Sequence, residues 1–351
     1  MSYLVATLST CKQLQDSLDS AWGIGELTRD RLNALEAITS FQHPMRAITS
    51  PGSGKKRSIE VVFDQRLSEA QVETVSERGC TSDYKPSEAT HVYEMDADIL
   101  EVSVQIDAGD LTTWCGSNPE LFTKEVAKLM DVLRRKIATQ TASEVSLLSG
   151  NWADGVTVDG NNALAIPTKK ANGDWDSEGF VDLNIAARDI TEYVNDYVII
   201  ADSEYWKYLK MVEMGCCAND GINLGSVFEN YGYAAMYDSR MAAAMANVDA
   251  NAFLINIGAV QLLNYVQSPW KDGTPIGQPF QGSNYVSMAI TDPVTGLLYD
   301  FMIKDECRGK ATLVMNAEVQ AKALPSNLYA TGDKYEGVNG INKIAISNPL
   351  S

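Results

Sequence analysis

The amino-acid sequence predicts an α+β fold, and three features of the chain support this prediction. From Phe122 to Ile137 apolar side chains recur at helical spacing, and neither Gly nor Pro occurs between Phe122 and Gly150. Segments rich in β-branched residues lie before and after this stretch. In the middle of the chain, short apolar strands alternate with helical patterns. With 351 residues, 45% of them hydrophobic, the chain can bury a sizeable core.

Residues 1–57 are expected to form an N-terminal arm. They hold seven basic and five acidic side chains, whereas the whole chain has 28 basic against 46 acidic residues and a net charge of −18. Apolar residues three to five positions apart indicate short amphipathic helices, broken at Gly23 and Gly25, on an otherwise solvated arm. The string from Pro51 to Arg57 lacks the spacing of a phosphate-binding loop and is interpreted as a flexible joint.

Two extended segments follow the arm. Ile59, Val61 and Phe63 alternate with mostly polar neighbours, and a second β-rich segment runs from Val92 to Ile106. The connection from Asp64 to His91 is mostly polar. Because an isolated hairpin is only marginally stable in water, we expect this excursion to lie on another surface.

The long helix is predicted to start at Asn118-Pro119-Glu120, an N-cap followed by proline and by an acid in the first turn. From Phe122 to Ile137 its apolar residues recur every three or four positions. Such a helix is about 45 Å long at 1.5 Å per residue. We expect Arg134, Arg135 and Lys136 to form a solvated face, the alternative being contact with an acidic neighbour or with nucleic acid.

The middle of the chain is predicted to be a compact α/β block. Its expected elements are, in order, a helix over residues 182–195, a strand over 197–200, a helix capped by Asp202 or Ser203, a strand over 252–255 and a helix that begins at Gly258. After this block, Asp292 to Gly296 reads as a hairpin turn between two strands. A third strand is predicted from Leu313 to Ala321.

Composition argues against several classes of function. Two histidines, His43 and His91, are too few for a three-histidine metal site. The excess of acidic residues disfavours a general nucleic-acid or membrane-surface binder. No apolar run reaches the roughly 18 residues of a membrane span, and the first residues lack the pattern of a signal peptide. The six cysteines contain no C-x-x-C pair and are interpreted as reduced thiols.

Two acidic motifs are also expected to be solvated rather than metal-binding. Asp96 and Asp98 stand two residues apart, as neighbours on one exposed strand face do. The string that starts at Asp174 imitates a calcium loop, but Ile185 occupies the position where that loop requires a glutamate.

The order of the predicted elements resembles that of the major capsid proteins of tailed bacteriophages, whose Hong Kong 97-type fold is shared with encapsulins. Two segments, Tyr197–Leu209 and Ala252–Leu263, look like parts of the axial domain of that family. The resemblance covers about residues 58–322. It implies an N-terminal arm (1–57), an extended loop (58–107), a peripheral domain (108–195 and 285–351) with a spine helix (119–149), and an axial domain (196–284).

The resemblance implies a structural protein without enzymatic activity, catalytic residues, metal or cofactor. It would self-assemble into hexamers and pentamers of an icosahedral shell around double-stranded DNA, in the virion, after synthesis in the host cytoplasm. Implied partners are other copies, a portal protein, and scaffolding or decoration proteins, with weak non-specific DNA contact and no membrane. Because the arm is short, no scaffold segment is expected to be removed from it. The candidate contacts between copies are Trp22, Arg57, Phe63, Lys85, Arg134 and Arg135.

Two alternative functions remain open at the level of sequence. An encapsulin-type nanocompartment shell has the same fold and holds enzyme cargo instead of a genome. A cytoplasmic enzyme would have to use carboxylates such as Asp96, Asp98, Asp107 and Asp110. The scarcity of histidine and the lack of a phosphate or metal motif argue against the enzyme.

Overall fold

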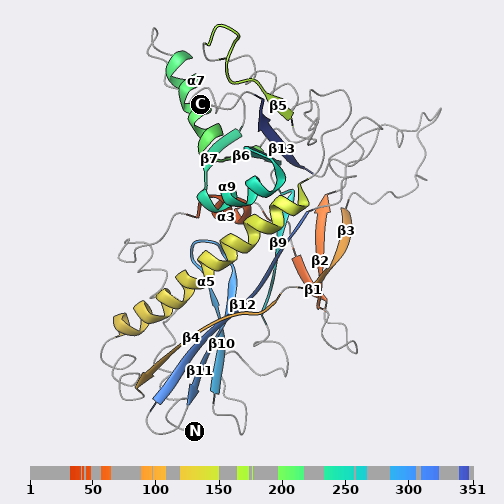
Figure 1. Cartoon of the computed structure of the whole chain (residues 1–351). Coiled ribbons are helices and arrows are strands. Elements are labelled where there is room, and N and C mark those ends of the chain that lie inside the picture. The colour runs from red at the N-terminus through yellow and green to blue at the C-terminus, as the bar shows by residue number, and fades with distance from the viewer. Residues whose placement is uncertain are drawn as a thin grey trace, which may run out of the picture. The chain divides into compact units, whose positions relative to one another are not determined.

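The computed structural model describes residues 32–40, 42, 45–48, 57–64, 88–96, 98–107, 119–149, 164–173, 176, 197–216, 233–256, 258–266, 285–305, 310–323 and 340–347 (Figure 1). Helices and sheets are both present, and the predicted α+β class is confirmed. The chain divides into two compact units. Unit 1 comprises Met1–Ser40, Ala97–Ser143 and Asn264–Gln320; unit 2 comprises Phe41–Asp96, Glu144–Leu263 and Ala321–Ser351.

Unit 1 is built on an antiparallel sheet. Its strands run in the order β10 (Tyr285–Thr291), β11 (Leu298–Asp305), β12 (Lys310–Ala323) and β4 (Leu100–Asp107). Cross-strand register places Phe301 of β11 opposite Met315 of β12, and Met315 opposite Val102 of β4. Phe301 and Met315 are fully buried, so this face of the sheet is the core of the unit.

The predicted hairpin and third strand are confirmed. β10 and β11 pair antiparallel on either side of the turn that starts at Asp292. Thr291 lies opposite Leu298 next to the turn, and Tyr285 lies opposite Lys304 at the far end of the ladder. Gly296 has a φ of 71°, a left-handed conformation that glycine adopts without steric cost. The turn chemistry was readable in the sequence because the strand pattern breaks at Asp292-Pro293 and resumes after Gly296.

The predicted long helix is also confirmed as α5 (Pro119–Leu148), 30 residues long and uninterrupted (Figure 1). Val126, Met130, Leu133 and Ile137 are buried, at spacings of four, three and four, and form its inner stripe. α5 lies against the unit 1 sheet, since the Gln140 side chain donates to the Val319 carbonyl of β12 at 3.3 Å.

Part of the N-terminal arm packs rather than being solvated. α3 (Asn33–Thr39) is a short helix in which Leu35 and Ile38 are buried, and Leu32 before it is fully buried. The expected short amphipathic helix is confirmed here. The expectation that the arm is solvated is wrong for these residues, because their three-residue spacing creates an apolar helix face that needs a partner surface. The earlier apolar positions of the arm lie outside the described residues.

Unit 2 contains a three-stranded antiparallel sheet, with order β1 (Met45–Ile48), β2 (Arg57–Asp64) and β3 (Glu88–Met95). The expected single β segment from Val92 to Ile106 is wrong. It divides into β3 in this sheet and β4 in the sheet of unit 1. Asp96 and Asp98 stand at the break, both exposed; aspartate is depleted in strands because it solvates better in irregular backbone.

The second sheet of unit 2 is mixed, with parallel pairing of β5–β13 and β6–β7 and antiparallel pairing of β13–β8 and β8–β6. In spatial order its strands are β5 (Leu164–Ile166), β13 (Ile341–Ile346), β8 (Ala252–Asn256), β6 (Tyr197–Ala201) and β7 (Tyr233–Tyr237). The strands predicted near 197 and 252 are confirmed, and every residue of β6 and β8 is buried. β5, β7 and β13 were not predicted.

Helices α7 (Ser203–Cys216) and α9 (Ser239–Met245), with a 3₁₀ turn over Ala246–Val248, belong to the same unit. The predicted cap is confirmed at Asp202, whose Oδ1 accepts from the Tyr205 backbone N–H at 2.7 Å. Asp238 caps α9 in the same way by accepting from the backbone N–H groups of Arg240 and Met241.

The helix expected from Gly258 is wrong, because this segment forms strand β9 (Val260–Tyr265), which pairs with β12. The Ala259 N–H donates to the Asn256 carbonyl, and Gly258 has a φ of 79°, so the chain makes a tight turn after β8. Val260 to Leu263 are all buried, and a short continuous apolar run does not distinguish a buried strand from a buried helix.

The helix expected over residues 182–195 and most of the joint before Arg57 lie outside the described residues. The part of the chain that the structure describes contains no helix both long and apolar enough to cross a bilayer.

Candidate functional site

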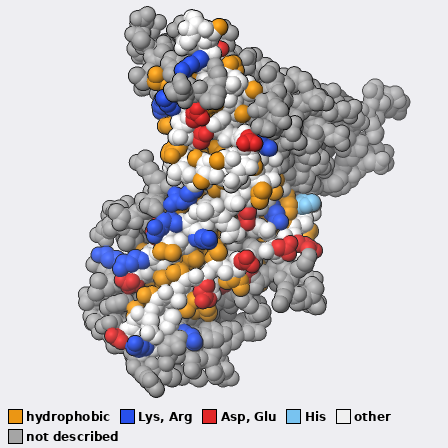
Figure 2. Space-filling model, viewed as in Figure 1, with side chains coloured by type: hydrophobic (Ala, Val, Ile, Leu, Met, Phe, Trp, Pro, Cys, Tyr) orange, Lys and Arg blue, Asp and Glu red, His pale blue; other side chains and the backbone are white. Residues whose placement is uncertain are grey.

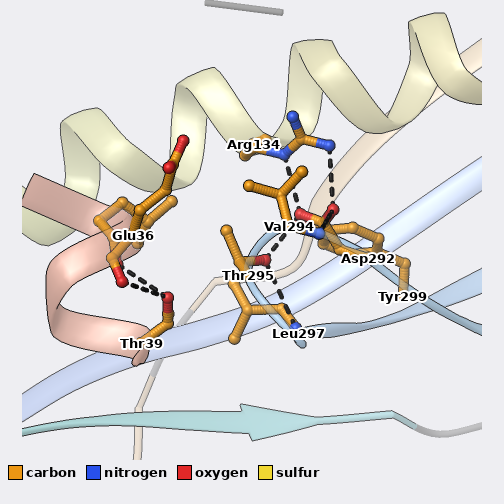
Figure 3. Close-up of polar contacts among 9 residues, drawn as sticks. Glu36, Thr39, Arg134, Asp292, Val294, Thr295, Leu297 and Tyr299 are labelled. Carbon is orange, nitrogen blue, oxygen red and sulfur yellow. Dashed lines mark hydrogen bonds and ion pairs between the residues drawn. The ribbon is translucent and has the colours of Figure 1, made fainter. Parts of the chain in front are cut away.

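The most constrained polar group in unit 1 is an ion pair between Arg134 of α5 and Asp292, the first residue of the β10–β11 turn. The Arg134 Nε donates to Asp292 Oδ2 at 2.8 Å, and Nη2 donates to Oδ1 at 2.9 Å (Figure 3). The two side chains are 1% and 0% exposed. This two-bonded geometry uses the planar fork of guanidinium, which a lysine cannot reproduce.

The turn itself prepares the carboxylate for this contact. Thr295 Oγ1 donates to Asp292 Oδ2 at 2.6 Å, and the Val294 backbone N–H donates to Oδ1 at 3.0 Å. The Gly296 N–H donates to the Asp292 carbonyl, while the Asp292 N–H donates to the Leu297 carbonyl, both at 2.8 Å. The carboxylate is held by its own turn as well as by α5, so the pair joins two rigid elements.

Tyr299, on β11, completes the cluster. Its hydroxyl donates to Asp292 Oδ2 at 3.4 Å, and its side chain is fully buried. Burial raises the pKa of Tyr299 far above its ordinary value, and the negative charge of Asp292 raises it further, against a smaller opposing effect of Arg134. The phenol therefore stays a neutral donor.

This arrangement suits a structural role. The guanidinium and both carboxylate oxygens are engaged with one another and with the turn, and the hydroxyl beside the carboxylate, that of Thr295, is itself buried in the turn. Among the described residues, no group of three or more His, Cys, Asp or Glu side chains could hold a metal ion. The cluster fixes the hairpin turn to the long helix.

The expectation that Arg134, Arg135 and Lys136 form a solvated face is wrong for Arg134, which is buried. It is confirmed for Arg135 and Lys136, which are exposed. Arg135 is 45% exposed and pairs with Asp131 at 3.1 Å one turn earlier, and Lys136 is exposed. Helical periodicity explains the difference, since Arg134 lies between Met130 and Ile137 on the buried stripe. That spacing was visible in the sequence, and the only missing information was the partner at Asp292.

The other candidate contact residues are placed only in part. Arg57 and Phe63 belong to β2, in register with Met95 and Ala89 of β3. Trp22 and Lys85 lie outside the described residues. A contact of Trp22, Arg57, Phe63, Lys85 or Arg135 with another copy stays a prediction, whereas the buried Arg134 has its charged partner within its own chain.

Of the carboxylates considered for an enzyme, Asp96, Asp98 and Asp107 are described in structure, and Asp110 is not. Asp96 and Asp98 are exposed, as expected for solvated side chains, and Asp107 lies at the exposed end of β4 opposite Lys310.

A second group of polar contacts, not anticipated from the sequence, completes the backbone bonding of β12. β4 pairs with β12 only as far as Ala317. Beyond it, Gln140 donates to the Val319 carbonyl, and Glu144 Oε2 accepts from the Ala321 N–H at 2.6 Å. Side chains of α5 thus bond backbone groups that lie beyond the β4 pairing.

The root of the β2–β3 hairpin is also anchored. The Tyr93 hydroxyl donates to the Ala323 carbonyl at 2.8 Å, and its ring packs edge-on against that of His91, with centroids 4.5 Å apart. Burial raises the pKa of Tyr93 to about 12. At neutral pH this hydroxyl keeps its proton and remains a donor.

No family model matches the sequence, and no curated protein does. Among solved structures, the chain is similar to a chain of the cyanophage A-1(L) capsid asymmetric unit, with 13% identity over 92% of this chain and 94% of that chain and a TM-score of 0.48. A chain of the cyanophage P-SCSP1u capsid is 12% identical over 92% of this chain and 90% of that chain, with a TM-score of 0.43. A chain of the capsid of an empty GTA particle is 12% identical over 92% of this chain and 100% of that chain, with a TM-score of 0.44. All three are chains of capsid structures.

Proposed function

We propose that this chain is a structural protein that associates with copies of itself to form the shell of a phage particle. The observation that carries the proposal is the succession of elements: hairpin β2–β3, strand β4, the 30-residue α5, a mixed sheet with α7, and finally β10, β11 and β12. This succession agrees with the element order on which the resemblance to capsid proteins of the Hong Kong 97 type was based.

The β1–β2–β3 sheet supports this role through its small core. Among its described side chains, Ile59, Val61 and Met95 are buried, while Val92 is 49% and Met45 is 39% exposed. A small sheet with so little apolar burial gains stability when its exposed face is covered by another surface. A neighbouring copy in a closed lattice would supply that surface.

The ion pair in unit 1 indicates that α5 stiffens this unit. Arg134–Asp292 ties the helix to the hairpin turn, and Gln140 ties it to β12. A long helix bonded at separated points to an antiparallel sheet is a stiff unit. Stiffness suits a subunit that must present the same contacts to every neighbour.

In its finer form, the proposal is a Hong Kong 97-type subunit that forms hexamers and pentamers of an icosahedral shell around double-stranded DNA. The arm (1–57), extended loop (58–107), peripheral domain (108–195 and 285–351) and axial domain (196–284) are its proposed parts. Portal and scaffolding or decoration proteins are its proposed partners. The net charge of −18 suits a container whose genome must pack and leave without tight binding.

Negative-stain electron microscopy of the purified protein tests this function. Closed particles of uniform diameter are the expected result, and a small soluble oligomer under all assembly conditions would contradict the proposal. Nuclease treatment followed by extraction of the particle contents then distinguishes a genome from protein cargo. Protein cargo would favour the nanocompartment alternative.

A further inference from the structure

The outward side of α5 carries a row of basic residues within unit 1. Lys124, Lys128, Arg135 and Lys136 are exposed, and Val132, 45% exposed, stands among them. We call these five residues the α5 outer stripe. Figure 2 shows Lys and Arg side chains interspersed with hydrophobic ones over the course of this helix.

The stripe keeps an excess of positive charge. Glu125 pairs with Lys128 at 2.5 Å, and Asp131 pairs with Arg135 at 3.1 Å, so two acids face four cations. In a chain with a net charge of −18, a local excess of cations is a distinctive surface. An apolar side chain exposed between cations favours a protein partner over the phosphates of a nucleic acid, since phosphates offer nothing for Val132 to pack against.

A segment of opposite character precedes and enters β4 in the same unit. Asp98 and Glu101 are exposed, and Ile99 between them is 55% exposed. We call these three residues the β4 acidic segment. β4 is an outer strand of the unit 1 sheet, with β12 as its neighbour on one side and no described strand on the other.

The two surfaces match in charge, and each has an exposed apolar side chain. From Lys128 to Arg135 the helix rises about 10.5 Å at 1.5 Å per residue, and Val132 lies between them. Side chains of an extended chain alternate in direction, so Ile99 and Glu101 share one side of the β4 acidic segment and Asp98 lies on the other. Ile99 and Glu101 therefore form the apolar and acidic pair that faces one partner surface.

We propose that the α5 outer stripe of one copy binds the β4 acidic segment of the next copy. Because the two surfaces are different patches of the same chain, the contact is head-to-tail and can repeat around a ring or along a lattice. The inference rests on the proposed function only in requiring that the protein associates with itself. It names Lys128, Val132 and Arg135 on one side and Asp98, Ile99 and Glu101 on the other.

Cysteine crosslinking between two different single variants tests the contact directly. Val132→Cys and Ile99→Cys proteins are oxidised separately and then as a mixture, with the wild-type protein as the background for its six native cysteines. A covalent dimer that appears only in the mixture is the expected result, because each dimer needs one of each new thiol. The absence of a mixture-specific dimer would overturn the proposal.

Charge reversal provides the second measurement. The helix variant carries Lys128→Glu and Arg135→Glu, and the strand variant carries Asp98→Lys and Glu101→Lys. Each is expected to self-associate at least about tenfold more weakly than the wild-type protein in sedimentation velocity. A mixture of the two restores association, since each basic surface again meets an acidic one. Lys207→Glu, an exposed lysine of α7, is the matched control and should leave association unchanged.

The outcomes separate this contact from the proposed function. Particles in the microscope without mixture-specific crosslinking would leave the shell function standing and refute the contact. Crosslinked dimers without closed particles would support the contact and contradict the shell function. If the helix variant loses bound DNA while its self-association is unchanged, the stripe contacts nucleic acid and the proposal is wrong.

Discussion

At the scale of single residues, Arg134 and its neighbour Arg135 form a natural comparison. We expect Arg134→Ala to lower the free energy of unfolding by about 3–5 kcal/mol, because it leaves the buried Asp292 carboxylate without its cation. Arg135 is half-exposed and pairs on the surface, so Arg135→Ala should cost at most about 1 kcal/mol. Chemical denaturation of both variants measures the difference.

Arg134→Lys sharpens this test, since lysine keeps the charge but loses the two-bonded geometry. We expect it to recover only part of the lost stability. Equal unfolding free energies for Arg134→Ala and Arg135→Ala would mean that the ion pair does not hold the turn to α5.

The buried phenol of Tyr299 predicts a loss of stability at alkaline pH. Its pKa is raised in the folded state, so the folded protein keeps this proton at pH values where the unfolded chain releases it. The contribution is fully present below about pH 10, the ordinary tyrosine value, and is lost as the pH rises above it. Tyr299→Phe should flatten this part of the profile of unfolding free energy against pH. An unchanged alkaline slope in Tyr299→Phe would contradict the assignment.

Two buried amides of the mixed sheet in unit 2 predict a gain in stability on substitution. Asn256 and Asn342 are fully buried and lie on the same face of neighbouring strands. Within the part of the chain that the structure describes, the side-chain oxygen and nitrogen of both amides have no hydrogen-bond partner. Since an unsatisfied buried polar group costs about 1–3 kcal/mol, Asn256→Val with Asn342→Val should raise the melting temperature.

Asn251 is the matched control for these amides. Its side chain donates to Asp202 Oδ2 and accepts from the Ile346 N–H, both at 2.9 Å. Asn251→Val should therefore lower the melting temperature in the same calorimetric experiment. If the double variant is also destabilised, the two buried amides are bonded in solution, for example to an internal water.

At the scale of elements, α5 supports β12 where the β4 ladder has ended. We expect Glu144→Ala to lower the free energy of unfolding by about 1–2 kcal/mol, because the Ala321 N–H loses its charged acceptor. Glu144→Gln keeps an acceptor oxygen and should cost less. Ser143→Ala, at an exposed position next to it, is the control, and hydrogen exchange at the Ala321 amide reports the effect locally.

Elements differ in how far local sequence determines them. α5 was predictable because its start signal at Asn118-Pro119-Glu120, its apolar spacing and the absence of Gly and Pro after Pro119 all act within the segment. β9 was not, because its apolar run fits a buried helix equally well and only pairing with β12 selects the strand. The division into β3 and β4 likewise depends on which sheet each half joins.

At the scale of the whole molecule, shortening the connection between β2 and β3 tests folding of the subunit separately from assembly of copies. The paired strands end at Asp64 opposite Glu88. Replacing residues 65–87 by an Asn-Gly turn keeps all of this ladder and should cost on the order of 1 kcal/mol, since loop length alters stability only slowly. On the shell proposal, the shortened subunit folds but does not close into particles.

Thermal denaturation together with size-exclusion chromatography checks both parts of this prediction. A cooperative transition with small oligomers is the expected result. Normal particles would show that the excised residues are not needed for contact between copies. An unfolded product would place them in the core of the subunit.

By itself, the sequence determined the α+β class, the long helix, the β10–β11 hairpin with its third strand, and the caps, because periodicity, capping and turn chemistry act over a few neighbouring residues. Only the tertiary structure decided which residues meet. Helical spacing places Arg134 on the buried stripe of α5, but Asp292 lies 158 positions away and no local signal identifies it as the partner. Burial made the difference, since a charge inside the protein is stable only where the fold brings its counter-charge.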